Sequence, residues 1–337
     1  MTIKDIARLA GVSVSTVSRV LNNHPDVSED NRENVLQVIR QQNYIPSNAA
    51  RSLVKTTSDS IGLIVKGISN PFYTDIIHAV EAQIATRGYT MVMQQIGTDQ
   101  DELAVGAMME RDKRLQGIVF MGGRSDYSAE DVAAINVPFV CCSYSNHYGK
   151  LPQSEYSSVS IADEEEAYRA VMELYKAGHR RIAVLLSEPD DKSVSQLRYQ
   201  GYVRALAECG IPLDDELVIR THTFDIRAGY TAMGLALKKG VSFTAVFSIS
   251  DIMAIGAMRA LREAGLDVPS DCSVIAIDGL EFTDYIHPQL STLSQPKEEI
   301  GCCSVDILLD IIQGKGCHQH KTLPTVFRAG ASLRRIG

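Results

Sequence analysis

The stretch that most constrains this chain is residues 2–23, TIKDIARLAGVSVSTVSRVLNN. Apolar side chains recur there at the spacing of one helix face, first at Ile3, Ile6, Ala7 and Ala10 and then at Val17, Val20 and Leu21. Between the two stripes, Gly11 can end the first helix and Ser13 can cap the second. Two helices joined by a short turn that contains glycine form a helix-turn-helix, whose second helix can enter the major groove of DNA.

The second predicted helix leaves four side chains off its apolar stripe, which are Val14, Ser15, Ser18 and Arg19. Arg19 is the expected base reader, because a guanidinium group can donate two parallel hydrogen bonds to the O6 and N7 atoms of guanine. The alternative is an ordinary pair of surface helices with one solvated arginine. Taken alone, this stretch leaves both interpretations open.

With 337 residues, the chain exceeds one typical domain, and two or three domains are expected. Its composition, 45% apolar and 22% charged, is that of a soluble globular protein. No apolar run of about eighteen residues is present, and the first residues predict a capped helix and not a signal peptide. We therefore expect a cytoplasmic protein without a membrane partner. The seven cysteines include no CxxC pair with metal spacing, so neither a metal nor a cofactor is expected.

The net charge of −8 is divided unevenly along the chain. Residues 1–58 hold seven Lys and Arg against five Asp and Glu, which gives +2, whereas the remainder holds 26 against 36, which gives −10. The basic surplus therefore accompanies the helix-turn-helix, and a larger acidic body follows. This asymmetry suits a DNA-reading head on a body that should not adhere to phosphates.

A third helix is expected over residues 28–42, with Ser28 as its N-cap and two acidic residues after it at the positive helix end. Three apolar side chains of this helix should pack on the first two helices: Val35, Leu36 and Ile39. Residues 47–56 are rich in alanine and could form one more short helix. An isolated helix of that length is marginal in water, so it should be ordered only when something packs on it.

From residue 61 onward, apolar runs of strand length alternate with helical stretches. The expected strands are 61–65, 90–94, 117–121, 137–142, 159–161, 181–186, 217–220, 245–249 and 273–277. The expected helices are 73–87, 101–111, 129–136, 164–176, 196–209, 227–238 and 252–265. Such alternation predicts parallel sheets wrapped by helices, and the restart of the pattern near residue 160 predicts two similar lobes. A ligand would then bind between the lobes, beyond the carboxyl ends of the strands.

Motifs spread over essentially the whole chain resemble those of the LacI/GalR family of bacterial transcriptional regulators. They are GVSVSTVSRVLNN at 11–23, NYIPSNAARSL at 43–53, SNPFY at 69–73, LRYQGY at 197–202, SDIMAIGA at 250–257 and VIAID at 274–278. The resemblance implies a small all-α helix-turn-helix domain followed by a two-lobed α/β body of the periplasmic-binding-protein type, with two parallel Rossmann-like sheets. It also implies a homodimer that binds a pseudopalindromic operator, most simply as a repressor, under the control of an effector.

The resemblance divides the chain into a head, a hinge with linker, and a body, at residues 1–46, 47–60 and 61–337. Within the body, the first lobe would comprise about 61–160 and 292–322, and the second about 161–291 and 323–337. In the head, the resemblance assigns base contacts to Val14, Ser15 and Arg19, and phosphate contacts to Thr16, Ser18, Asn22 and Ser28. Small polar residues at helix N-termini fix the register on DNA without reading its sequence. For Ser13 and Ser28, helix capping alone is the alternative.

Residues 47–55 resemble the family's hinge helix. Leu53 would insert into the minor groove at the centre of the operator, with Asn48 and Ala50 along the groove. An apolar wedge can replace lost base stacking, at an unstacking cost of about a few kcal/mol. The alternative for Leu53 is burial in an ordinary helix pair. Val54 departs from the pattern, since some members carry a basic residue there, and one phosphate contact is then missing.

In the body, the resemblance suggests an effector site made of Phe72, Tyr73, Lys192, Arg198, Phe224, Asp251 and Asp278, with Gly122 and Gly123 as further candidates. Opposite charges in one cleft can pair with the several hydroxyl groups of a sugar. A structural salt bridge is the alternative for Arg198 and Asp278, and core packing is the alternative for Phe72. The effector is expected to be a sugar or sugar derivative.

Two other functions remain as alternatives to an effector-controlled regulator. An α/β enzyme with a helical appendage is disfavoured because the sequence has no GxGxxG after residue 61, no GxxxxGK[ST] and no GxSxG. A cytoplasmic sugar-binding module is disfavoured by the capped, basic head. Some relatives respond to a phosphocarrier protein, and the sequence leaves that partner open.

Overall fold

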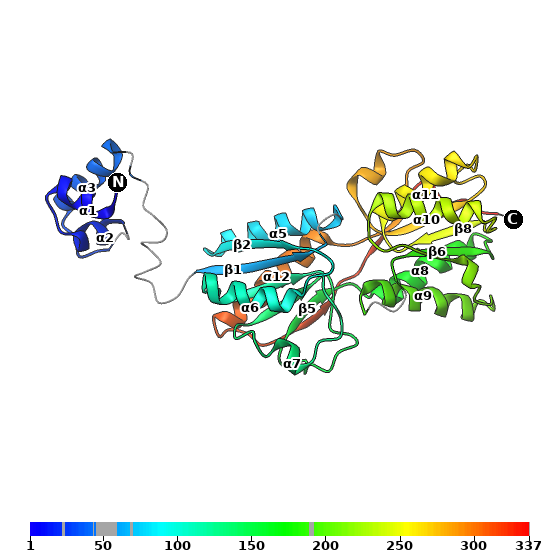
Figure 1. Cartoon of the computed structure of the whole chain (residues 1–337), viewed down its shortest axis with the longest axis horizontal. Coiled ribbons are helices and arrows are strands. Elements are labelled where there is room, and N and C mark those ends of the chain that lie inside the picture. The colour runs from blue at the N-terminus through cyan, green and yellow to red at the C-terminus, as the bar shows by residue number, and fades with distance from the viewer. Residues whose placement is uncertain (22–23, 43, 45–58, 68–69, 189–191, 337) are drawn as a thin grey trace. The chain divides into compact units, whose positions relative to one another are not determined.

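The computed structural model describes residues 1–21, 24–42, 44, 59–67, 70–188 and 192–336. The chain divides into two compact units, residues 1–58 and 59–337. The first contains the predicted head and most of the hinge with linker, and the second contains the body. Figure 1 labels helices and strands of both units. The fold is the predicted one, a helical head followed by an α/β body with two sheets.

Three helices build the described part of the head, α1 (Ile3–Ala10), α2 (Val14–Leu21) and α3 (Glu29–Gln41). Their apolar stripes meet in a core made of Ile6, Ala7, Ala10, Val17, Val20 and Val35. The prediction that Leu36 packs in this core is wrong, because its side chain is 39% exposed. Val38 takes that place, since it lies one turn after Val35, whereas Leu36 is rotated by about 100°.

The first lobe of the body holds a six-stranded parallel sheet in the order β11-β5-β4-β3-β1-β2. Its strands are β1 (Ser60–Lys66), β2 (Thr90–Ile96), β3 (Gly117–Met121), β4 (Phe139–Cys142), β5 (Ser157–Ser160) and β11 (His320–Thr322). Its helices are α5 (Phe72–Thr86), α6 (Glu102–Lys113), α7 (Ala129–Val132) and α12 (Lys297–Ile312). Helices α5 and α12 pack together on one face, and α6 covers the other.

The second lobe repeats this arrangement with strand order β12-β10-β9-β8-β6-β7. Its strands are β6 (Ile182–Leu186), β7 (Val218–Arg220), β8 (Ala245–Ser248), β9 (Ser273–Asp278), β10 (Ser291–Ser294) and β12 (Val326–Arg328). Its helices are α8 (Asp163–Lys176), α9 (Val194–Glu208), α10 (Ile226–Lys238) and α11 (Asp251–Glu263), with short 3-10 turns η1 (Asp215–Leu217) and η2 (Glu281–Asp284). Helices α8 and α9 cover one face and α10 and α11 the other (Figure 1). Strand β12 runs antiparallel to β10, so this sheet is not purely parallel as predicted.

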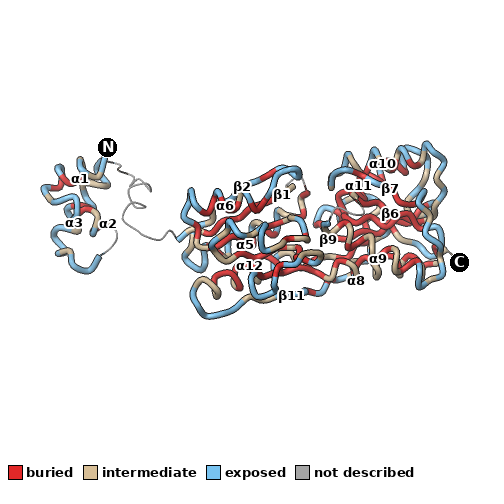
Figure 2. The backbone as a smooth tube through the Cα atoms, turned by 60° about the horizontal axis from the view of Figure 1, so that its bottom comes forward, coloured by how far each residue is buried: buried red, intermediate tan, exposed pale blue. Residues whose placement is uncertain are grey.

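Burial explains why the central strands have continuous apolar sequences. Figure 2 shows buried strands inside both lobes and exposed outer sides of the helices. Every residue of β3 and of β6 is buried, because helices cover both faces of each sheet. Within the described part of the chain, no helix is both long and apolar enough to cross a membrane.

The chain crosses between the lobes after β5, after β10 and after β11. The sequence placed residues from about 292 onward in the first lobe. Strand β10 (Ser291–Ser294) instead pairs with β9, so that crossing falls after Ser294. The elements β10, β11, α12 and β12 are not among the predicted ones, and α7 ends earlier than the predicted helix 129–136.

Candidate functional site

Helix α2 turns one face to solvent. Val17 and Val20 are buried in the core of the head, whereas Ser15 and Arg19 are exposed and Val14 is 41% exposed. The predicted base-contacting side chains therefore lie together on the open side of the helix. An exposed guanidinium in that position can reach a base edge in the major groove.

Hydroxyl groups gather at the N-terminus of α2. Ser13 Oγ lies 2.7 Å from Ser15 Oγ and 2.8 Å from Thr16 Oγ1, and it accepts a hydrogen bond of 3.1 Å from the backbone N–H of Thr16. Ser13 therefore caps this helix, as predicted. The positive helix end beside these hydroxyl groups suits a phosphate of the DNA backbone.

The remaining predicted DNA contacts are only partly placed. Ser28 is the N-cap residue of α3, as predicted, but its side chain makes no capping hydrogen bond. Ser18 is half-buried on α2. Four predicted contacts lie outside the described residues, and their roles stay predictions from the resemblance: Asn22, Asn48, Ala50 and Leu53.

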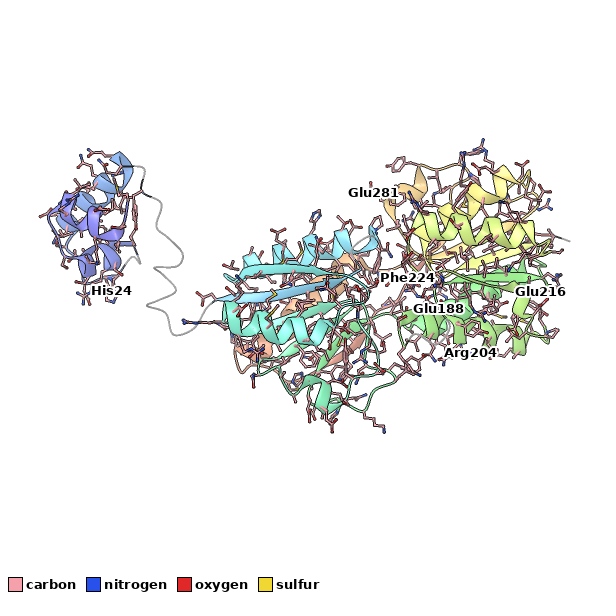
Figure 3. The ribbon with its side chains drawn as sticks, in the orientation of Figure 1. His24, Glu188, Arg204, Glu216, Phe224 and Glu281 are labelled. Carbon is pink, nitrogen blue, oxygen red and sulfur yellow. The ribbon has the colours of Figure 1, made fainter. Side chains whose placement is uncertain are left out.

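A cavity of about 760 Å³ opens between the two lobes of the body. Its lining residues lie at the carboxyl ends of strands from both sheets. Lys66 ends β1 and Asp278 ends β9, whereas Gly122 follows β3 and Ser187 follows β6. This is the edge at which open α/β sheets bind ligands. Figure 3 shows labelled Phe224 and Glu188, which also line the cavity, on the side of the second lobe that faces the first.

Arg198 is the buried charge at the centre of the second-lobe wall. Its Nε donates a 2.8 Å hydrogen bond to Asp163 Oδ1, its Nη1 donates to the backbone carbonyl of Ile249, and Nη1 lies 3.5 Å from Asp278 Oδ1. The side chains of Arg198 and Asp278 are only 5% and 2% exposed. The pair is therefore held rigidly and is largely removed from bulk water.

Two oxygen atoms on this wall have no hydrogen-bond partner in the described part of the chain, Asp278 Oδ2 and Ser250 Oγ. Both residues line the cavity and are almost completely buried. The other oxygen of Asp278 is occupied, because Gln295 Nε2 donates to it at 2.9 Å. Buried polar atoms normally have partners, and a ligand hydroxyl group in the cavity could supply one for each of these two.

Burial also sets the charge of this wall. The pKa of Asp278 is raised to about 7, chiefly because the carboxyl group is buried; Arg198 opposes this shift and Asp251 adds to it. Burial likewise raises the pKa of Asp163, although Arg198 again lowers it. Burial raises the pKa of Tyr73 to about 12, so its hydroxyl group stays protonated and can donate to a ligand.

The first-lobe wall is built around Glu102, whose side chain is 1% exposed. Its carboxylate accepts hydrogen bonds from Lys66 Nζ at 2.6 Å, from Tyr127 Oη at 2.5 Å and from the backbone N–H of Arg124 at 3.0 Å. Burial alone would raise the pKa of Glu102, but these hydrogen bonds lower it overall. Glu102 is therefore ionised and forms a second polar cluster at the cavity.

The structure brings most of the predicted effector residues together. Those that line the cavity are Phe72, Tyr73, Gly122, Gly123, Arg198, Phe224 and Asp278. Lys192 and Asp251 do not line it. The carboxylate of Asp251 accepts hydrogen bonds from Thr292 Oγ1 and Leu280 N instead, and Lys192 Nζ lies 5.2 Å from the centre of the Tyr148 ring.

Lys66, Glu102 and Tyr144 line the cavity and are absent from the predicted site. Lys66 could have been found, because it ends an apolar run of strand length at the same sheet edge as the predicted residues. Glu102 could not, since nothing in the local sequence distinguishes it from a solvated helix residue.

Comparison with known proteins agrees with this architecture. Residues 2–47 match the family model for bacterial regulatory proteins of the lacI family, and residues 171–333 match that for a periplasmic binding protein-like domain. The HTH-type transcriptional regulator MalR of Clostridium butyricum is 42% identical over 329 residues, which cover 96% of this chain and 97% of MalR.

Two solved structures are similar over the whole chain. The lac repressor dimer bound to operator and the anti-inducer ONPF is 26% identical with a TM-score of 0.80, covering 98% of each chain. The complex of the transcriptional regulator CelR with cellobiose is 28% identical with a TM-score of 0.73, covering 98% of this chain and 99% of that one. The chain therefore belongs to the LacI family of bacterial regulatory proteins and is a DNA-binding transcriptional regulator, not an enzyme.

Proposed function

We propose that this regulator is a cytoplasmic repressor that binds a pseudopalindromic operator as a homodimer, and that a saccharide bound between the lobes controls its affinity for DNA. The observation that carries the proposal is the polar lining of the cavity. It contains the buried ion pair of Arg198 and Asp278, and two of its oxygen atoms, Asp278 Oδ2 and Ser250 Oγ, have no partner among the described residues. Ligand hydroxyl groups can both donate to and accept from such groups. The similar structures of the operator-bound lac repressor dimer and of the CelR–cellobiose complex support operator binding as a dimer and control by a saccharide.

Each group in the cavity has a role in this proposal. Arg198 and Asp278 hold ligand hydroxyl groups, and Phe72, Tyr73 and Phe224 contact the apolar faces of the sugar ring. Lys192 acts indirectly, because its backbone carbonyl accepts a 2.7 Å hydrogen bond from Ser125 N across the two lobes. Asp251 likewise supports the wall through Leu280 N.

In the head, Val14, Ser15 and Arg19 would contact bases, and the hydroxyl groups of Thr16, Ser18 and Ser28, with Asn22, would contact phosphates. The hinge residues Asn48, Ala50 and Leu53 are proposed to occupy the minor groove. Control would be a population shift. The conformation of the body would set the spacing of the two hinge segments, and an effector would act through its different affinities for the two conformations.

Replacing Arg19 by alanine tests the DNA-reading part of the proposal. The variant Arg19→Ala should lose roughly 1–3 kcal/mol per half-site and should lose its preference at one base pair, because the bidentate contact to guanine disappears. The measurement is titration of operator DNA and of operators substituted at each base pair.

Arg8→Ala provides the control, since Arg8 is an exposed arginine on α1 with a weak ion pair to Asp5. It can weaken binding uniformly but should leave the base preference intact. Equal base preferences of Arg19→Ala and the parent protein would overturn the assignment of Arg19.

Effector control is tested by measuring operator affinity with and without saccharides, sugar phosphates and nucleosides. At least one of these compounds should change the affinity. The alternative partner is a phosphocarrier protein. If that protein changes operator affinity while no small molecule does, control by a cavity ligand is disproved.

A further inference from the structure

We infer that the effector is an uncharged saccharide of more than one ring, without a phosphate or carboxylate group. This inference rests on the proposed function, since it concerns the ligand of the same cavity. It follows from the charges on the cavity wall, from the partners of its cations, from the helix ends beside it and from its size.

Negative charges predominate on the described cavity wall. Its acidic residues are Asp99, Asp101, Glu102, Asp131, Glu188 and Asp278, of which Asp278 has a pKa raised to about 7. Its Lys and Arg residues are Lys66, Arg124 and Arg198, and the lining histidine His222 lies 3.2 Å from Glu188. Two segments next to lining residues in the sequence, 68–69 and 189–191, lie outside the described residues, and neither contains a lysine or arginine. A like charge at short range costs several kcal/mol in a partly desolvated site, so this wall disfavours an anionic ligand.

Each cation on the wall is already paired with a carboxylate. Lys66 Nζ lies 2.6 Å from Glu102 Oε2. Arg124 lies 3.6 Å from Asp126 and 3.5 Å from Asp131. Arg198 is held by Asp163 at 2.8 Å and by Asp278 at 3.5 Å. At Lys66 and Arg198 a phosphate would have to displace a closely bonded carboxylate, because sites that recognise phosphate present unpaired arginine or lysine groups to it. Arg124 is 45% exposed and more loosely paired, but two carboxylates share its charge.

Helix N-termini, the other common anion sites, are also occupied here. Asp101 Oδ1 accepts from the N–H groups of Leu103 and Ala104 at the start of α6. Asp225 Oδ1 accepts from Ala228 N at the start of α10, which follows the lining residue Phe224.

The same holds for α5 and α9. Asn70 Oδ1 accepts from Phe72 N, and Ser193 Oγ accepts from Ser195 N. Helix α11 begins with Asp251, whose own negative charge lies in its first turn. Ser250, the N-cap of α11, makes no capping hydrogen bond. Side chains thus fill the position that a ligand phosphate would need at α5, α6, α9 and α10, and α11 carries a carboxyl group in its first turn.

The size of the cavity favours more than one sugar ring. Its volume of about 760 Å³ lies in the upper half of the range of roughly 300–1,000 Å³ found for cavities that hold drug-sized ligands. Its polar groups form two clusters on different lobes, Glu102 with Lys66 on the first and Arg198 with Asp278 on the second. A ligand with hydroxyl groups at both ends can use both clusters.

Calorimetric titration of the full-length protein with matched compounds tests this inference. The panel comprises free disaccharides (maltose, cellobiose, sucrose and trehalose), the monosaccharides glucose, fructose and ribose, and the phosphates glucose 6-phosphate and trehalose 6-phosphate. At least one free disaccharide should bind at least ten-fold more tightly than every monosaccharide and every phosphate, and it should change operator affinity.

The variant Glu102→Gln provides a second readout. It leaves the charge of Lys66 uncompensated, so affinity for the sugar phosphates should rise relative to the free sugars, and affinity for the disaccharide should fall. The matched control is Glu110→Gln, because Glu110 is a buried carboxylate of the same helix that bonds to Asn136 and does not line the cavity. Its ligand preferences should equal those of the parent protein.

Tighter binding of a sugar phosphate than of any free sugar overturns the inference, and so does a monosaccharide that binds as tightly as the best disaccharide. In either case, if that ligand changes operator affinity, the proposed function stands. If no compound changes operator affinity, effector control fails and this inference fails with it.

Discussion

At the scale of single residues, Asp278 has two energetically unfavourable features and lines the cavity. Its φ angle is 141°, a conformation that favours glycine, and its Oδ2 has no partner among the described residues. Backbone conformations of this kind cost of order 1–3 kcal/mol and persist where the surrounding structure enforces them. Strain and an unpaired carboxyl oxygen at the same residue are typical of a ligand-binding position.

The raised pKa of Asp278 predicts a pH dependence of stability. The ordinary value is 3.8 and the folded value is about 7, so between these values the folded chain holds a proton that the unfolded chain releases. The contribution of Asp278 to the free energy of unfolding therefore falls as pH rises through this window, by on the order of a few kcal/mol.

Unfolding of the body by urea at pH 4.5, 6 and 7.5, without effector, measures this effect. The variant Asp278→Asn has no proton to release there, so its stability should fall less steeply with pH than that of the parent protein. The buried residues Asp163 and Asp251 contribute to the pH dependence of both proteins. Only the difference between the curve of the parent protein and the curve of Asp278→Asn therefore reports on Asp278. Parallel curves would show that Asp278 does not titrate as described.

Gly122 limits the cavity from the first lobe. Its φ angle is 70°, and a Cβ atom there would lie 2.7 Å from Tyr73 Oη and 3.0 Å from the carbonyl oxygen of Lys66. The variant Gly122→Ala should be destabilised by about 1–2 kcal/mol from its backbone alone and should bind effector at least ten-fold more weakly, because the methyl group displaces Tyr73.

Gly210→Ala is the matched control for this prediction. Gly210 has a similar φ angle of 66°, but no atom lies within 4 Å of the added Cβ. Both variants should lose stability in thermal unfolding, whereas only Gly122→Ala should lose effector affinity in calorimetry. Equal effector affinities of the two variants would exclude a role for the Gly122 position in ligand binding.

At the scale of elements, the caps of the head helices differ in a way that the sequence does not reveal. Ser13 and Ser28 are both serines at helix N-termini, yet only Ser13 Oγ accepts a backbone hydrogen bond. The periodicity of residues 2–23 sufficed to predict α1 and α2, because each helix buries its own apolar stripe. Whether a cap side chain bonds to its helix depends on its rotamer, and sequence position does not specify that.

The two serines therefore predict different effects of the same substitution. Ser13→Ala should destabilise the head by about 1 kcal/mol, since the cap of α2 is lost. Ser28→Ala should leave the stability of the head almost unchanged and should weaken operator binding at all sequences alike. Amide hydrogen exchange of α2 and α3, followed by operator titration, measures both effects. Equal losses of protection in the two variants would contradict the assignment of the caps.

At the scale of the whole molecule, the head and the body are separate compact units, and the proposed control needs coupling between them. Coupling between two ligands is reciprocal by thermodynamic necessity. We therefore predict that the factor by which effector changes operator affinity equals the factor by which operator DNA changes effector affinity, within a range of about 5–150-fold.

Titrating effector with and without operator, and operator with and without effector, measures both factors. A larger effector affinity on DNA identifies a corepressor, and a smaller one identifies an inducer. Unequal factors would mean that a further binding or assembly step, such as dissociation of the dimer, accompanies one of the two titrations.

The sequence by itself determined the helix-turn-helix, the alternation of strands and helices, and the family, because these depend on local periodicity and on motifs in fixed order. The motifs also pointed to Arg198 and Asp278, which line the cavity; their contact with an effector stays a prediction. The tertiary structure decided which neighbouring residues face the cavity: Ser250 lines it and Asp251 does not.

Only the tertiary structure could show the pairing of Lys66 with Glu102 and of Arg198 with Asp163, or the antiparallel pairing of β12. These contacts join residues far apart in the sequence, and chain folding alone brings them together. The charge that a ligand meets is therefore a property of the assembled lobes, although every carboxylate and guanidinium in them can be read from the sequence.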